Sequence, residues 1–402
     1  MGNAKTSADL QLGERVVDRV LSAHIHTGKL VVTYPSGQRR TYGKGAKAVH
    51  VRVHSLPISR FGNPSLFVGE SYMHKNIEID EDQLDELFRI MSLNEVKSPL
   101  LRATQSLPKR QLNRRQFQRR QISHHYDVGN DYYKLWLDKS MTYSCAYFKR
   151  PHDSLEKAQQ QKTDHVLRKL QLETGQTLLD IGCGWGHLAV AAARKYGVRV
   201  LGITLSEEQA TAAKKLAERE EVNKLVSFEL KNYQDLSSHQ QFDRIVSVGM
   251  FEHVGRGNHA IYFEKVRELL KDNGVSVLHT ITARHEHAAS SWIDKYIFPG
   301  GYLPTIALIE ELLARYNFLS VDRENLWQHY AMTLDIWRQR HRAHREQIIK
   351  MFDEPFYRMR DLWLAGSAAA FRYAGTDINQ FIFTKHKPKR WPLTREYLYT
   401  QK

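Results

Sequence analysis

The chain has 402 residues, of which 42% are hydrophobic and 10% aromatic, so a wholly disordered protein is excluded and two or three structural units are expected. Lys and Arg total 59 and Asp and Glu total 44, and the resulting net charge of +15 predicts an anionic partner, either nucleic acid or a membrane surface. The first residues lack the apolar core of a secretory signal, and no apolar run approaches the roughly 20 residues that span a bilayer. With Cys145 and Cys183 as the two cysteines, a reducing compartment is expected.

Residues 1–95 are predicted to form a small α+β domain. Its helices and strands are predicted from the spacing of apolar residues, from turn residues between strands, and from acidic residues in the first turn of a helix. These are a helix over 16–25, a hairpin over 30–42 with its turn at 35–37, a strand over 49–53 and a helix over 80–91.

Residues 96–124 are predicted to be a basic linker, because Lys and Arg recur there and acidic residues are absent. The segment is either a solvated connector or a site of electrostatic docking to an anionic bilayer. Phe117 is its one aromatic residue, so a surface for stacking nucleic-acid bases is disfavoured.

From residue 125 onward, strands and helices alternate, which predicts a mostly parallel sheet. The expected strands cover 177–181, 198–203, 226–230, 244–248 and 275–281, the expected helices cover 187–196 and 206–219, and a helical region follows over 330–371.

A glycine loop follows the first of these strands. The segment Leu179-Asp180-Ile181-Gly182-Cys183-Gly184-Trp185-Gly186 has the spacing G-x-G-x-G, where glycine permits a tight turn and close approach of a ligand. A dinucleotide site would have G-x-G-x-x-G and an acidic residue about 20 positions later. Both are missing, so the loop favours S-adenosylmethionine over a nicotinamide cofactor.

Three further side chains are candidates for chemistry. Glu252 lies in Gly249-Met250-Phe251-Glu252-His253 just after a predicted strand, and His279 ends another strand, so both are expected at the ligand edge of the sheet. The alternatives are a helix cap for Glu252 and a structural role for His279. Cys145, in Tyr143-Ser144-Cys145-Ala146-Tyr147-Phe148, is either a nucleophile or a small buried hydrophobe.

Taken together, these segments resemble the cyclopropane-fatty-acyl-phospholipid synthases and the related mycolic acid cyclopropane synthases. The resemblance covers about residues 120–385, and residues 1–95 resemble the extra domain of the phospholipid-acting members. It is carried by 125–131, 142–148, 179–186, 249–255, 278–281, 298–304 and 329–330. It implies an α/β fold, with a Rossmann-like class I methyltransferase domain over 125–402 and the small N-terminal domain before it.

The resemblance also implies the ligand contacts. S-adenosylmethionine would be bound by Tyr143, Ser144, Asp180, Gly182, Gly184, Gly186, Thr204, Leu205, Gln209, Tyr233 and Gln234. A bicarbonate ion would be held by Cys145, Glu252, His279, the backbone of Ile281, and Tyr330. No metal is expected, and Cys145 would be a hydrogen-bonding ligand. Two anions would meet at Glu252, so a shared proton or a cationic His279 is expected.

The implied reaction adds a methylene group from S-adenosylmethionine to the cis double bond of an acyl chain in a membrane phospholipid. It proceeds through a carbocation that bicarbonate deprotonates, and Tyr147, Phe251 and Phe298 are candidates to stabilise that cation. The expected partners are a phospholipid bilayer and a second copy of the chain. The expected location is cytoplasmic, on the inner face of a bacterial membrane.

Three alternatives stay open. A fatty-acyl phospholipid methyltransferase would form a methylene or methyl branch in place of a ring. A nucleic-acid methyltransferase is suggested by charge, but Gly249-Met250-Phe251-Glu252 stands where its Asn/Asp-Pro-Pro-aromatic motif belongs. The third alternative is a lipid-binding protein without activity. The sequence does not specify acyl-chain length, double-bond position or headgroup.

Overall fold

The computed structural model describes residues 10–56, 63–94, 129–286, 290–388 and 390–399. The predicted basic linker lies outside these residues. The chain divides into two compact units, the first made of 1–107, 289–297 and 341–374 and the second of the remaining segments. The sequence suggested contiguous domains, whereas these units combine separated segments. Among the described helices, none has the length and apolar character needed to cross a membrane.

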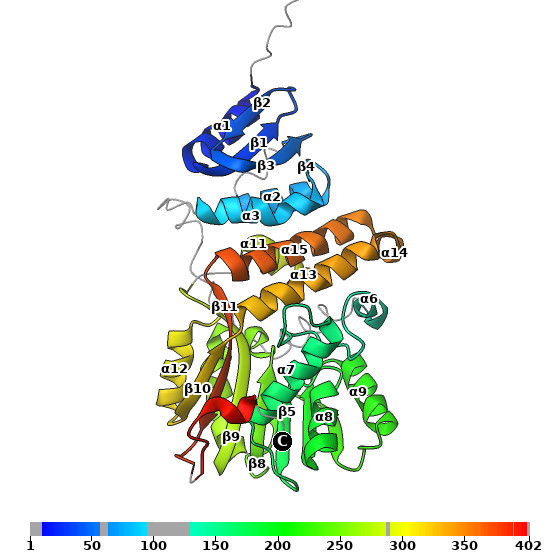
Figure 1. Cartoon of the computed structure of the whole chain (residues 1–402), viewed down its shortest axis with the longest axis vertical. Helices are drawn as coiled ribbons and strands as arrows, with labels where there is room; N and C mark the ends of the chain where they lie inside the picture. Colours follow the sequence, from blue (N-terminus) through cyan, green and yellow to red (C-terminus); the bar gives the residue numbers. More distant parts are fainter. Residues whose placement is uncertain (1–9, 57–62, 95–128, 287–289, 389, 400–402) are drawn as a thin grey trace, which may run out of the picture. The chain divides into compact units, whose positions relative to one another are not determined.

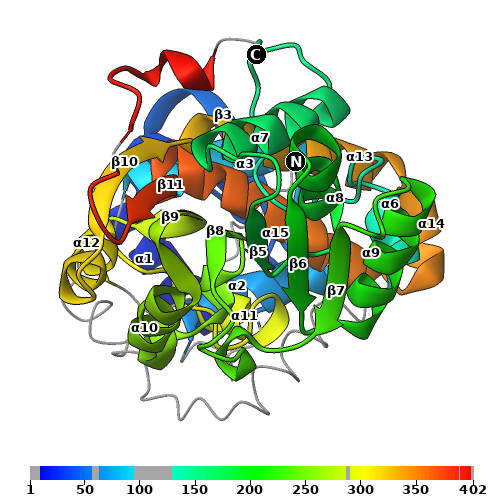
Figure 2. The ribbon, with the colours of Figure 1, turned by 90° about the horizontal axis from the view of Figure 1, so that it is seen from below.

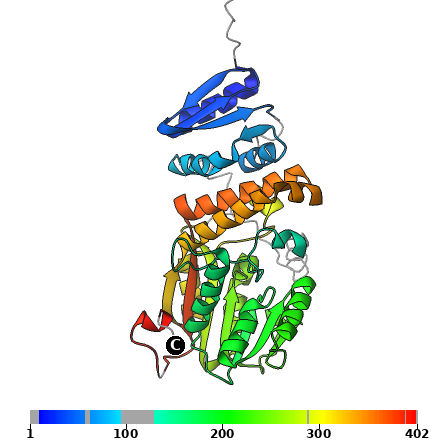
Figure 3. The same cartoon turned by 45° about the vertical axis from the view of Figure 1, so that its right-hand side comes forward.

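The first unit contains a four-stranded sheet with the order β2-β1-β3-β4 (Figure 3). Its strands are β1 (Thr27–Thr33), β2 (Arg39–Tyr42), β3 (Lys44–Val53) and β4 (Ile77–Ile79). Helix α1 (Leu12–His24) begins before the predicted residue 16 and packs Val17 and Leu21 on the sheet's core.

Helices complete the first unit and explain why late segments belong to it. They are α2 (Pro64–Met73), η2 (Glu81–Gln83), α3 (Leu84–Leu93), α11 (Ser291–Tyr296), α14 (Arg345–Met351) and α15 (Glu354–Tyr373). Asp85 of α3 accepts hydrogen bonds from Arg372 at 3.0 Å and from Tyr373 at 2.9 Å. Glu70 of α2 accepts one from Lys295 at 2.8 Å. These contacts fasten α15 and α11 to the N-terminal segment.

The second unit is built on a seven-stranded sheet, whose strands follow one another from left to right in Figure 2 in the order β10-β11-β9-β8-β5-β6-β7. Its strands are β5 (Thr177–Ile181), β6 (Arg199–Thr204), β7 (Val226–Leu230), β8 (Phe242–Val248), β9 (Leu270–Ala283), β10 (Leu319–Asn325) and β11 (Thr376–Thr384). All neighbours from β7 to β9 are parallel, and β11 is antiparallel to both β9 and β10. The predicted mostly parallel α/β sheet is confirmed.

Helices cover both faces of this sheet (Figure 1). Those of the second unit are α6 (Asn130–Lys134), α7 (Leu155–Lys169), α8 (His187–Tyr196), α9 (Glu207–Arg219), η3 (Tyr233–Asp235), η4 (Phe251–His253), η5 (Arg256–Asn258), α10 (His259–Leu269), α12 (Ile306–Arg315), most of α13 (Trp327–Ala343) and η6 (Arg395–Leu398).

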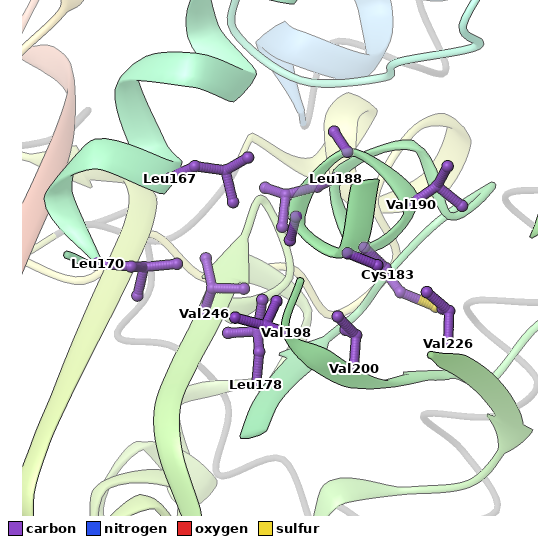
Figure 4. Close-up of a cluster of buried hydrophobic side chains, with 14 of the residues drawn as sticks. Leu167, Leu170, Leu178, Cys183, Leu188, Val190, Val198, Val200, Val226 and Val246 are labelled. Atoms are coloured by element: carbon purple, nitrogen blue, oxygen red, sulfur yellow. The ribbon is translucent and has the colours of Figure 1, made fainter. Parts of the chain in front are cut away.

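Successive side chains along a strand point to opposite faces of the sheet, so the apolar ones contribute to two separate cores. Leu178 of β5 points into the core shared with α7, α8 and α9, which Figure 4 shows, whereas Leu179 joins the core formed with α10 and α12. On β9, Val277 belongs to the first core and Leu278 to the second. His279 therefore faces the side of the sheet that α7 covers.

Candidate active site

A pocket lies at the carboxyl ends of β5, β6 and β8, where parallel strands bring the loops that follow them to one edge of the sheet. It is lined by nine of the predicted cofactor residues, namely Tyr143, Ser144, Asp180, Gly182, Gly184, Thr204, Leu205, Gln209 and Tyr233. Gly186 and Gln234 are not among the lining residues.

The glycine loop shapes one wall of the pocket. Gly182, Gly184 and Gly186 have φ angles of 82°, 55° and 85°, in the left-handed region that glycine adopts without a steric cost. A Cβ at Gly186 would meet Phe228 at 2.7 Å, so this glycine serves the packing of α8. A Cβ at Gly184 would extend into open space, and the backbone is therefore exposed to a ligand there.

The loops after β6 and β7 form the adjoining wall. Thr204 donates from its hydroxyl to Gln209 Oε1 at 2.8 Å, and this contact fixes the Gln209 side chain at the start of α9. Gln234 donates to the Tyr233 hydroxyl at 3.3 Å, so it supports a lining residue. Lys231 and Asn232 also line the pocket.

Lys162 of α7 is a lining residue that the sequence analysis missed. It is 2% exposed, and its ammonium donates to Ser144 Oγ at 3.1 Å. Burial lowers the pKa of Lys162 to about 8 and raises that of Asp180 to about 7, although the charge of Lys162 opposes the shift at Asp180. The sequence carries a signal, because Lys162 follows Leu155 and Ala158 at helical spacing on the buried face of α7.

A second group of polar side chains lies where β8 ends. The prediction that His279 ends its strand is wrong, because β9 continues to Ala283, but His279 is paired with Val248, the last residue of β8. Ile281 donates its backbone N–H to Glu252 Oε1 at 2.7 Å. His279 and Ile281 are two residues apart on β9, so they share a face of the sheet. Glu252 Oε2 and His279 Nε2 are buried, and neither has a hydrogen-bond partner among the residues that the structure describes. Such a pair of unsatisfied atoms is costly unless a ligand binds them.

Burial sets the protonation states of this pair. It raises the pKa of Glu252 to about 7, while the hydrogen bond from Ile281 opposes the shift. It lowers the pKa of His279 well below the usual value, and the cations Lys162 and Lys169 add to this effect. A Glu252 carboxyl that holds a proton near neutral pH and a neutral His279 imidazole are therefore favoured, and the expected cationic His279 is disfavoured.

Cys145 is fully buried in the loop before α7. Burial raises the pKa of its thiol, which donates to the Ala146 carbonyl at 3.2 Å, so a thiolate nucleophile is disfavoured. Ala146 donates its backbone N–H to Thr333 at 3.0 Å. Tyr330 precedes Thr333 by three residues on α13, and the Cys145 loop thus lies beside the turn that carries Tyr330.

The three aromatic candidates occupy different surroundings. Tyr147 is stacked between His165 and His329, with ring centroids 4.3 and 4.7 Å away. Phe251 is fully buried in the core formed with α10 and stacks on His259. The rings of Phe298 and His253 form a T-shaped pair with centroids 5.7 Å apart. Of these residues, His253 also lines the pocket.

Comparisons with known proteins agree on the kind of enzyme. The model of the mycolic acid cyclopropane synthetase family matches residues 113–381, and a domain of unknown function (DUF7884) matches residues 16–102. A probable fatty acid methyltransferase of Pseudomonas putida is 36% identical over 85% of this chain and 89% of its own. The cyclopropane-fatty-acyl-phospholipid synthase of Escherichia coli K12 is 43% identical over 65% of this chain and 66% of its own.

A solved structure of a similar protein points to the same family. The mycolic acid cyclopropane synthase CmaA1, solved with S-adenosylhomocysteine and CTAB, is 37% identical and has a TM-score of 0.63, covering 66% of this chain and 97% of its own. This likeness confirms the class I methyltransferase fold expected of the second unit.

Proposed function

The chain belongs to the mycolic acid cyclopropane synthetase family, and from this premise we propose that it transfers a methylene group from S-adenosylmethionine to the cis double bond of an acyl chain in a membrane phospholipid. The family makes it an S-adenosylmethionine-dependent methyltransferase. The observation that carries the finer proposal is the buried pair Glu252 and His279, whose free Oε2 and Nε2 atoms lie at the same sheet edge as the pocket.

The pocket fits S-adenosylmethionine in charge and shape. The amino-acid portion of S-adenosylmethionine carries a carboxylate and an ammonium. The pocket offers a side chain of opposite charge to each, Lys162 for the carboxylate and Asp180 for the ammonium. Asp180 Oδ2 is buried without a hydrogen-bond partner among the described residues, as expected for an atom that a ligand satisfies. When bound, the cofactor supplies an electrophilic methyl group. Gly184 would let its adenosyl portion approach the backbone closely.

The Glu252 and His279 pair fits a small oxyanion. A protonated Glu252 and a neutral His279 can both donate hydrogen bonds, so an anion between them meets no like charge. We assign these two residues, with the neutral thiol of Cys145 and the hydroxyl of Tyr330, to hold a bicarbonate ion, which would supply the base for the proton removed at ring closure. Ile281, whose N–H is engaged by Glu252, would act by orienting that carboxyl.

This arrangement avoids a protein base inside an apolar site. A buried carboxylate without compensation is costly, and the raised pKa of Glu252 reflects that cost. The side chains therefore bind and orient, while the base itself is a diffusible ion.

A second candidate is a fatty-acyl methyltransferase that forms a methylene or methyl branch. It is favoured by the Pseudomonas putida relative, which spans 85% of this chain and is described as a probable fatty acid methyltransferase. Both reactions need the same pocket and differ in which proton leaves.

The deciding experiment uses the purified full chain, S-adenosylmethionine, bicarbonate and vesicles of anionic phospholipid with cis-monounsaturated chains. The recovered lipid is examined by proton NMR. High-field cyclopropane signals are expected. Vinylidene or methyl-branch signals would favour the second candidate, and unchanged lipid despite measured cofactor binding would contradict both.

Bicarbonate dependence tests the assigned ion separately. In carbon dioxide-depleted buffer the rate of ring formation is expected to fall and to recover when bicarbonate is added back. His279→Asn should lower the rate and weaken this dependence, while S-adenosylhomocysteine binding stays normal in calorimetry. A full rate without bicarbonate would overturn the assignment.

The membrane is proposed as the partner surface, and the enzyme as a homodimer peripheral to the inner face of the cell membrane. The net charge of +15 favours anionic lipid, since each Lys or Arg near such a surface contributes on the order of 1 kcal/mol. Cosedimentation with vesicles should increase with anionic lipid content and decrease with salt. Binding that is insensitive to both would contradict this proposal, and sedimentation velocity tests the dimer.

A further inference from the structure

Behind His279 lies a continuous chain of buried polar side chains. Gln380 Nε2 is 2.8 Å from His279 Nδ1, and Gln380 Oε1 accepts a hydrogen bond from Lys169 Nζ at 2.7 Å. Lys169 also forms an ion pair with Glu324, which His165 contacts at 2.7 Å. His279, Lys169 and Gln380 are all fully buried.

Four elements, β9, β10, β11 and α7, bring these residues together. Gln380 is paired directly with His279 in the antiparallel register of β9 and β11, so the two side chains rise from the same face of the sheet. Lys169 reaches this face from the last turn of α7, and Glu324 lies near the end of β10. None of the four side chains lines the cofactor pocket.

The donor and acceptor in each of these hydrogen bonds follow from the charge of Lys169. A lysine ammonium only donates, so the atom of Gln380 that faces Lys169 must be its carbonyl oxygen. The amide NH2 group of Gln380 then faces His279 and donates, so Nδ1 must accept with its lone pair. A neutral imidazole carries one proton, which is thereby placed on Nε2.

We infer that Lys169, acting through Gln380, is a positioning residue that holds His279 in the Nε2–H tautomer. His279 then presents a hydrogen-bond donor to its ligand, and its ring has no basic nitrogen on that side. The donor role of Nε2 toward an anion rests on the proposed bicarbonate site, whereas the tautomer follows from the hydrogen bonds alone.

The charges around His279 agree with a neutral ring. Lys162, Lys169 and His165 act on it from α7 and Glu324 from β10, while Glu252 is hydrogen-bonded to Ile281, two residues further along β9. The hydrogen bonds and ion pair with His165 and Lys169 outweigh burial and lower the pKa of Glu324 to about 2. Glu324 therefore stays ionised. Burial lowers the pKa of Lys169, and the charge and hydrogen bond of Glu324 oppose that shift and favour the ammonium form that donates.

The wild-type enzyme tests the tautomer directly. In a spectrum of 15N-histidine-labelled full chain, the His279 signals are assigned by their loss in His279→Gln. We expect Nδ1 to resonate as an unprotonated nitrogen and Nε2 as a protonated one at neutral pH. A protonated Nδ1 would overturn the inference, whatever the activity of the enzyme.

The substitution Gln380→Glu replaces the amide NH2 group that donates to His279 with a carboxylate oxygen that accepts. The side chain keeps almost the same shape. A carboxylate at this position accepts from Lys169 and from His279, so the neutral ring must carry its proton on Nδ1 and lose the donor at Nε2. We expect activity reduced roughly ten- to hundredfold at alkaline pH, as for a lost hydrogen bond to a charged ligand. Because the new carboxylate raises the pKa of His279, activity should recover toward acidic pH, where both nitrogens are protonated.

The exposed Gln240→Glu is the matched control and should keep the wild-type pH profile. A merely structural role for Gln380 predicts a loss that is the same at every pH and an unchanged His279 tautomer. That result would refute the inference. If the tautomer is as predicted but no cyclopropane forms, the proposed function fails and the positioning role stands.

Discussion

Lys162 and Asp180 supply opposite charges to the proposed cofactor pocket, from α7 and β5. Their pKa values, about 8 for Lys162 and about 7 for Asp180, result mainly from burial. Lys162 is cationic below pH about 8, and Asp180 is anionic above pH about 7. Both charges thus coexist in a narrow window near neutral pH.

Affinity for S-adenosylhomocysteine should therefore be greatest between pH about 7 and about 8 and decline on both sides. Lys162→Met should weaken binding roughly tenfold or more and remove the alkaline decline. The acidic decline should move to higher pH, because the charge of Lys162 normally lowers the pKa of Asp180.

Calorimetric titrations at several pH values measure these effects. Lys157→Met is the matched control, since Lys157 lies on the same helix and is 55% exposed. This role for Lys162 would be excluded if both variants lost the same affinity for S-adenosylhomocysteine. It would also be excluded if the affinity of Lys162→Met still declined at alkaline pH as in the wild type.

Cys145 gives a second prediction at the scale of one residue. Its buried thiol has a raised pKa and is neutral, so a hydroxyl can replace it as a hydrogen-bond donor. Cys145→Ser should lower turnover by about tenfold or less and leave cofactor affinity unchanged. Turnover on lipid vesicles and calorimetry measure the two quantities. Complete inactivity with normal cofactor binding would instead indicate a covalent nucleophile.

At the scale of an element, the loop between β5 and α8 separates the roles of its glycines. Gly186 and Gly184 both have positive φ, but only Gly186 is crowded, by Phe228 and Ala213. The loop therefore both packs a helix and exposes backbone to a ligand.

Gly186→Ala should lower the free energy of unfolding by about 1–3 kcal/mol, from overpacking and backbone strain. Gly184→Ala should cost about 1–2 kcal/mol from strain alone and weaken cofactor binding more strongly. Calorimetric unfolding with and without S-adenosylhomocysteine compares the pair. A larger thermal loss in Gly184→Ala would contradict this division of roles.

At the scale of the whole molecule, the first unit depends on segments far apart in the sequence. Asp85 is bonded to Arg372 and Tyr373 of α15, and the Ser92 hydroxyl donates to the Tyr373 carbonyl at 2.6 Å. The N-terminal residues thus rely on a helix that follows most of the second unit in the chain.

Residues 1–107 expressed alone should therefore lack a cooperative thermal transition, whereas the full chain should show one for this unit. Circular dichroism and calorimetry measure the difference. Cooperative unfolding of the fragment at the temperature seen in the full chain would show that α15 is dispensable.

Local pattern predicted much of the second unit. Strand β5, helix α8 and strand β7 have the predicted bounds, because the apolar spacing of all three, and the glycines that flank β5 and α8, are properties of adjacent residues. Helix α7 was not predicted. Its buried face carries Gln159, Lys162, His165 and Lys169, and polar residues there hide the apolar period.

The sequence by itself determined the glycine loop, the parallel succession of strands and the placement of Glu252 just after a strand, whereas His279 lies inside β9 and not at its predicted end. The three features that it determined depend on turn chemistry and periodicity over a few residues. Only the tertiary structure decided that Lys162 enters the pocket, that Gln380 and Lys169 stand behind His279, and that α15 joins the N-terminal segment. Such contacts form because distant segments must bury apolar surface together, and the polar groups carried inside with them must then find partners.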